Sequence, residues 1–214
     1  QFKKPLMYAP DTLVNNELGV KSEWLDHKLQ LNATVYQEKW TNVQVAFFDP
    51  VDGFGTLTFS TNGPNYQVEG AEVQIIARPM RALTLQGSAS LNHSKQTNAP
   101  CLIDNVPENA SFGQCIPGVN PFGPAGTSLA MSPEFQGNLR ARYEWAQGGY
   151  NAFWQVGLQY QGSSSSLVGS VPTIAPTGST TQSFQNPAYT LIDASTGFAK
   201  DQWSCQLVVH NLAN

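Results

Sequence analysis

Apolar and polar residues alternate along several segments of this chain. In Leu29–Tyr36 (LQLNATVY) every second residue is apolar, and the same period of two runs through Leu83–Asn92, Leu139–Trp145 and Ala152–Gln161. Successive side chains of a β-strand point to opposite faces, so each segment is expected to form a strand with one apolar and one polar face. The pattern predicts an all-β chain of antiparallel strands.

The connections between these segments alternate between short and long. Short turns are expected at Leu25-Asp26-His27, Gln147-Gly148-Gly149 and Lys200-Asp201-Gln202, and long loops at about 49–57, 95–130 and 162–187. Roughly eight strands result, with all the short turns on one side. This is the layout of a transmembrane β-barrel with short periplasmic turns and long extracellular loops, and residues 1–214 are expected to form one such partial domain.

The composition agrees with a strand that meets lipid on one face. Only 12% of the residues are charged, against about 25% in ordinary soluble domains. There is no run of about 18 apolar residues that could form a spanning helix, but alternation hides a lipid face from any averaged hydropathy. Aromatic residues near strand ends would form interfacial girdles; they are Trp24, Tyr143, Trp145, Tyr189 and Trp203. A secreted β-sandwich, in which these aromatics form the core, is the alternative.

The second strand is expected to be unusually long. Its alternation continues from Leu29 past Trp40 to Phe47, which gives roughly 20 residues, or about 66 Å at about 3.3 Å per residue. The returning strand is expected to be interrupted by a bulge or a kink at Asn62-Gly63-Pro64-Asn65 and to end near Arg78-Pro79. The surplus length would stand above the membrane, since a bilayer needs only about 9 to 11 residues per strand.

The cysteines and the net charge restrict compartment and partners. Cys101 and Cys115 lie in one Pro/Gly-rich loop and are expected to form a disulfide in an oxidising compartment, with two free thiols as the alternative. The net charge of -4 with scattered Lys and Arg leaves no footprint for nucleic acid.

Candidate site residues fall into two groups. Inward-facing charges could guide a solute, contact a plug, or simply pair across strands; they are Glu17, Lys21, Glu23, Glu72, Arg140, Arg142 and Glu144. Loop aromatics could stack on a ligand or anchor their own loops; they are Phe54, Phe112, Phe122 and Phe184. No Cys/His spacing suits a metal and no nucleophile frame is present, so we predict no catalytic residue, no metal, no cofactor and no enzyme activity.

Three ordered segments resemble the C-terminal half of TonB-dependent outer-membrane receptors. They are NELGVKSEW at Asn16–Trp24, VEGAEVQIIARP at Val68–Pro79 and YTLIDASTGFAKDQWSCQLVVHNLAN at Tyr189–Asn214. The first is similar to the family's Glu-x-Gly-x-Lys strand, the second to its Gly-x-Glu strand ending at Pro, and the third to its Asn-Leu strand ending. Together they span nearly the whole chain.

The resemblance implies a barrel of about 22 strands around an N-terminal plug. Such a receptor takes up an iron siderophore, cobalamin or a saccharide with energy coupled through TonB, and sits in the lipid of the bacterial outer membrane. The chain contains no plug and no terminal aromatic residue, so we expect a fragment with strands missing at both ends. The alternatives are a complete small barrel of eight strands, a passive porin, and the secreted β-sandwich as a binding or adhesion module.

Overall fold

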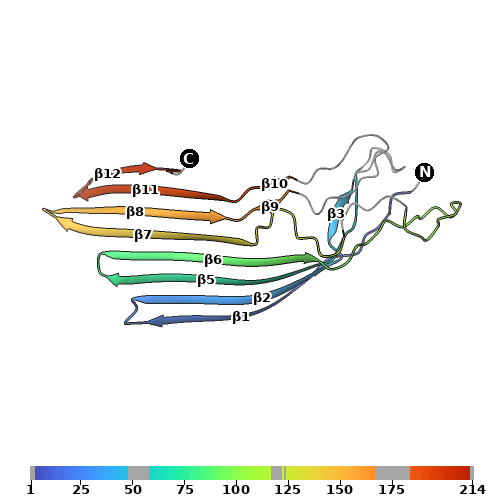
Figure 1. The fold of residues 1–214 in the computed structure, drawn as a ribbon, viewed down its shortest axis with the longest axis horizontal. Coiled ribbons are helices and arrows are strands. Elements are labelled where there is room, and N and C mark those ends of the chain that lie inside the picture. The colour runs from blue at the N-terminus through green and yellow to red at the C-terminus, as the bar shows by residue number, and fades with distance from the viewer. Residues whose placement is uncertain (1–2, 48–57, 117–121, 123, 167–183, 213–214) are drawn as a thin grey trace.

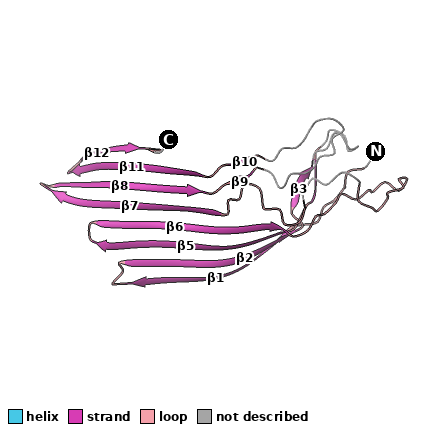
Figure 2. Ribbon diagram, in the orientation of Figure 1, coloured by secondary structure: helices cyan, strands magenta, loops and turns pink. Residues whose placement is uncertain are grey.

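A computed structural model describes residues 3–47, 58–116, 122, 124–166 and 184–212. Every regular element among these residues is a β-strand, as Figure 2 shows. In the described part of the chain no helix has the length and apolar character needed to cross a membrane.

Eight strands form one antiparallel sheet in which spatial order follows chain order (Figure 1). They are β1 (Thr12–Trp24), β2 (Leu29–Thr41), β5 (Tyr66–Met80), β6 (Leu83–Gln96), β7 (Phe135–Gln147), β8 (Tyr150–Gln161), β11 (Tyr189–Lys200) and β12 (Trp203–Val209). β1 and β12 are the edges of this open sheet. The all-β, antiparallel prediction with roughly eight strands is confirmed.

Two small sheets lie at the end of the strands that carries the long connections (Figure 1). β3 (Gln44–Phe47) pairs with β4 (Phe59–Asn62), and β9 (Ser164–Ser165) pairs with β10 (Gln185–Asn186). The connections that Figure 1 draws at the opposite end are all short. The predicted separation of short turns from long loops is therefore present.

The prediction of one long strand from Leu29 to Phe47 is wrong. β2 ends at Thr41 because Asn42 has a φ of 55°, a left-handed conformation that leaves the extended path. The side chain of Asn65 holds this bend by accepting a hydrogen bond from the Asn42 N–H at 2.8 Å. The predicted interruption of the returning strand is confirmed, since β4 ends at Asn62 and β5 begins at Tyr66.

Three of the short turns contain residues with positive φ. Gly148 and Gly149 have φ values of 59° and 81° and close the β7–β8 hairpin in two residues, as a type I′ turn requires. Leu25, Asp26 and His27 all have positive φ in the β1–β2 turn. Asp201 does the same between β11 and β12, where Lys200 pairs directly with Trp203.

Cross-strand register divides the sheet into two chemically distinct faces. An apolar row crosses the sheet through Leu18, Val35, Ala71, Leu91 and Phe135. A polar row of opposite parity crosses it through Lys21, Asn32, Gln74, Ser88, Asn138 and Gln159. The alternation in each strand thus adds up to one apolar face and one polar face.

Nothing in the described structure covers the apolar face. Leu18 is 75% exposed, Leu139 54% and Leu158 41%, although all three lie on strands of the large sheet. The buried apolar side chains come instead from the long-loop end; they are Val43, Phe59, Tyr66, Leu102, Val106, Ile116 and Phe122. A sheet with so much exposed apolar surface requires an apolar surrounding rather than water.

Candidate functional site

The polar face of the sheet surrounds a hollow of about 740 Å³. Amide and hydroxyl side chains dominate its lining, which includes Asn32, Gln74, Ser88, Asn138 and Gln159. Several of these groups bond across strands, as Asn138 does to the Ser88 hydroxyl at 2.6 Å. The hollow therefore offers many neutral donors and acceptors and few ions.

The register places the inward-charge candidates on this polar face. Each lies an even number of residues from the polar-row residue of its own strand, so its side chain points to the same face. They are Glu17, Lys21, Glu23, Glu72, Arg140, Arg142 and Glu144. Most of them are separated, but Arg142 and Glu144 form an ion pair with Nε and Oε1 3.0 Å apart. Glu23 instead contacts His27 in the adjacent turn.

Arg142 is held at its place on β7 by three neighbours. Besides Glu144, its Nη1 donates to the Gln155 side chain at 3.4 Å, and its guanidinium carbon lies 3.9 Å from the centre of the Phe153 ring. A cation over an aromatic face is attracted by the ring quadrupole. Arg140 donates to the Gln86 side chain on β6.

The loop after β6 is tied back to the strand ends. Gln96 is 1% exposed, its backbone N–H donates to the Thr127 carbonyl, and its carbonyl accepts from Gly126. Thr97 donates to the Asn65 carbonyl at 2.8 Å. These bonds anchor both sides of the loop to the mouth of the sheet.

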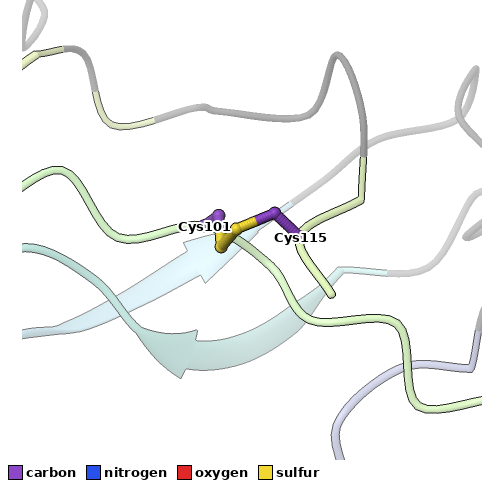
Figure 3. The surroundings of a disulfide bond; sticks show 2 residues. All are labelled: Cys101 and Cys115. Carbon is purple, nitrogen blue, oxygen red and sulfur yellow. A yellow bond between two sulfur atoms is a disulfide. The ribbon is translucent and has the colours of Figure 1, made fainter. Parts of the chain in front are cut away.

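A disulfide between Cys101 and Cys115 closes the first half of this loop (Figure 3). The two cysteines are 14 residues apart in sequence. Within the closed segment the chain folds back on itself, because Ile116 donates to the Leu102 carbonyl and Asp104 to the Gln114 carbonyl, both at 2.9 Å. We refer to residues 101–116 as the disulfide loop.

Asp104 organises the interior of the disulfide loop. Its carboxylate is buried and accepts hydrogen bonds from the Val106 N–H at 3.0 Å, the Asn109 amide at 3.0 Å and the Ser111 hydroxyl at 2.6 Å. Burial raises the pKa of Asp104, but the hydrogen bonds from Ser111, Val106 and Asn109 together hold it below its ordinary value. Asp104 is not among the residues predicted from the sequence, although an Asp two residues before its backbone donor is the signature of an Asx turn.

The structure separates the four loop aromatics. Phe122 is only 7% exposed and lies beside Gly63, where a Cβ would be 3.4 Å from its ring. Phe122 therefore anchors its loop, which is one of the two alternatives that the sequence left open for these aromatics. Phe112 is 54% exposed in the disulfide loop and Phe184 is 64% exposed beside β10. Phe54 lies outside the described residues.

Aromatic side chains gather on the apolar face toward the short turns. Tyr143 stacks on Trp154 across β7 and β8 with ring centres 6.0 Å apart, and Tyr150 meets Phe198 edge to face at 5.8 Å. Trp203 is 81% exposed on β12. Tyr189 departs from the prediction: its hydroxyl donates to Gln161 at 2.8 Å, which places it on the polar face and outside the girdle.

Among the described residues no three His, Cys, Asp or Glu side chains come close enough together to hold a metal ion. The histidines pair singly with carboxylates instead, as His93 does with Glu134 at 3.4 Å.

A polar inner face, an uncovered apolar outer face with an aromatic band, and long loops confined to one end define the wall of a transmembrane β-barrel. The profile of the TonB dependent receptor-like β-barrel family matches residues 7–212. The chain belongs to this family of transport receptors.

Solved structures with this fold include several iron-uptake receptors. The siderophore receptor PiuA from Acinetobacter baumannii has 19% identity and a TM-score of 0.62, with 94% of this chain and 24% of the receptor aligned. The ferric yersiniabactin receptor FyuA from Yersinia pestis has 13% identity and a TM-score of 0.62, over 94% and 25%. The ferripyoverdine receptor of the outer membrane of Pseudomonas aeruginosa has 17% identity and a TM-score of 0.58, over 95% and 23%. The chain thus spans about a quarter of the length of these receptors.

Proposed function

We propose that this chain forms part of the wall and mouth of an outer-membrane receptor that takes up a scarce nutrient, with a ferric siderophore as the first candidate. The observation that carries the proposal is the division of the sheet into an exposed apolar face and a polar face, with a structured loop at one end. Family membership and the iron-uptake receptors that share the fold support the substrate class.

The long-loop end would face the cell exterior and capture the substrate. Phe112 and Phe184 offer exposed rings there, and an aromatic ring can stack on a chelate or sugar ring. The disulfide and the buried Asp104 cluster hold Phe112 on a rigid support. A pre-organised loop loses less conformational entropy when it binds.

The polar face would line the route through the barrel. Its amide-rich hollow can exchange hydrogen bonds with a polar solute or with a plug of the same receptor. In this proposal energy from TonB moves the plug and opens a path along the wall, and the inward charges contact the plug or the solute.

The test is deletion of residues 101–115 from the intact receptor. We expect binding of ferric siderophores, measured over a panel that also contains cobalamin and oligosaccharides, to weaken at least about tenfold while heat-modifiable migration of the barrel persists. Phe112→Ala should give a milder loss. Unchanged affinity for every compound in the panel would exclude the loop from binding.

A passive porin is the second candidate, since an amide-rich lumen also suits free diffusion. Uptake by cells that lack TonB separates the two. A porin passes its solute at the same rate in such cells, whereas the proposed receptor does not.

A further inference from the structure

The polar face carries a basic pocket near its short-turn end. This hollow of about 330 Å³ is lined by Arg78, Thr84, Gln86, Arg140, Arg142 and Gln155. Its three arginines come from two strands, β5 and β7, that are separated by β6. Arg78 is not among the inward-facing charges predicted from the sequence, because its place beside Arg140 depends on the register of β5, β6 and β7.

The positive charge of the basic pocket is only partly neutralised. Arg142 pairs with Glu144, but among the described residues no carboxylate lies within 4.0 Å of the guanidinium of Arg78 or Arg140. Three arginines therefore face one carboxylate, which leaves an excess of two positive charges (three minus one).

The acidic groups elsewhere on the polar face do not compensate for this excess. Glu17 and Glu72 lie nearer the long-loop end, and Glu23 is paired with His27. Asp193 lies level with Arg140 on β11, with β8 between them. Its carboxylate already accepts hydrogen bonds from the Asn211 N–H at 3.0 Å and from His210 at 3.3 Å.

We propose that the basic pocket binds a carboxylate or phosphate group. A guanidinium presents a planar fork of donors that matches both anions, and an anion between Arg78 and Arg140 would relieve their mutual repulsion. The hydroxyl of Thr84 and the amide nitrogens of Gln86 and Gln155 add donors around it. The inference rests on the proposed function, because only a closed barrel makes this face a lumen.

The anion can come from two sources. One is an acidic side chain of polypeptide that occupies the lumen, and the other is an anionic group on a solute that passes through. Either would be held near the short-turn end, where the route leaves the barrel.

The experiment uses the intact receptor, purified in detergent at low salt, with citrate as the probe. Arg78→Gln and Arg140→Gln are compared with wild type, and Arg140→Lys keeps the charge without the fork. Arg81→Gln is the matched control, because Arg81 lies in the turn after β5 and outside the pocket. Heat-modifiable migration confirms that each variant is folded. Calorimetry measures citrate binding, and hydrogen exchange follows the polypeptide inside the lumen.

Two results support the proposal and identify the source. If the site takes a free anion, citrate binds wild type and each Gln variant weakens it at least about tenfold. If polypeptide fills the site, citrate does not bind wild type, and each Gln variant speeds hydrogen exchange at least about tenfold in a lumenal segment that contains Asp or Glu. Arg140→Lys falls between wild type and Arg140→Gln in either case.

The proposal is overturned if the Gln variants alter neither readout, or if Arg81→Gln alters either one as much as they do. Failure of the proposed function has a different signature. Uptake by the wild-type receptor would then be equally fast in cells with and without TonB, while anion binding to the pocket could still be measured.

Discussion

The ring of Tyr36 lies over Gly70, its direct partner on the adjacent strand, in the space where any other residue would carry its Cβ. The Tyr36 hydroxyl continues across the polar face and donates to the Asn92 side chain on β6. One side chain thus links three neighbouring strands, and it can do so only because residue 70 is a glycine.

Gly70→Ala should destabilise the barrel by about 1 to 3 kcal/mol, because the new methyl group overlaps the Tyr36 ring and lies 2.8 Å from the backbone carbonyl oxygen of Leu91. Thermal unfolding of the receptor in detergent, followed by the loss of heat-modifiable migration, measures the effect. Gly157→Ala is the control on the same face, since a Cβ there meets no atom within 4 Å. Equal loss in the two variants would contradict the role of the Tyr36 ring.

Leu139→Arg should impair assembly far more than Asn138→Arg, although the two positions are adjacent on β7. Leu139 is exposed on the apolar face, and an arginine at the membrane midplane costs about 2 to 4 kcal/mol. Asn138 bonds to Ser88 on the polar face, where an arginine remains hydrated. Folding yield into phospholipid vesicles distinguishes the two variants, and similar yields would argue that the apolar face does not meet lipid.

Opening the disulfide should loosen the disulfide loop and leave the barrel intact. A crosslink that closes a loop of this length removes unfolded-state entropy worth about 3 kcal/mol. In Cys101→Ser/Cys115→Ser receptor, external protease should cleave between residues 101 and 116 while heat-modifiable migration is unchanged. Cys205→Ser serves as the control, because Cys205 has a free thiol and lies on β12. Continued resistance to protease in the double variant would show that the Asp104 hydrogen bonds suffice.

Acid should loosen the same loop. The pKa of Asp104 lies below its ordinary value of 3.8 in the folded loop, so the carboxylate stabilises the loop fully at pH values above 3.8 and loses this effect as the pH falls through the lower folded value. The protection of the Val106 amide against hydrogen exchange, relative to its intrinsic exchange rate at each pH, should therefore decrease below pH 3.8. Asp104→Asn should remove this dependence, whereas Glu108→Gln, at an exposed carboxylate, should preserve it.

Features with a strict local period could be predicted from the sequence, and features that depend on register could not. The alternation of Leu29–Tyr36 gives its two faces directly, and Gly148 and Gly149 give their turn. The contact between Tyr36 and Gly70 joins residues on separate strands, so it exists only once the register of β2 and β5 is known. The basic pocket has the same origin, because β6 separates Arg78 from Arg140.

Two features show where local patterns do not suffice. The alternation up to Phe47 suggested one strand, but Asn42 adopts a left-handed conformation that Asn65 stabilises, and Asn65 is remote in sequence. Phe122 carries no local sign of burial, because its position beside Gly63 depends on how the loop folds against the strand ends.

Cys205 offers a direct test of which face meets lipid. It lies on β12 with the parity of Trp203 and Leu207, so its thiol should project from the apolar face of the intact receptor. A lipid-soluble maleimide should label it in membranes, while a charged, water-soluble maleimide should label it at least about tenfold more slowly, because a charged reagent does not readily enter the lipid. Moving the thiol by one residue, as Ser204→Cys in a Cys205→Ser background, turns it to the polar face and should reverse the preference. If both positions react equally with the charged reagent, this part of the sheet has water on both sides and is not a barrel wall.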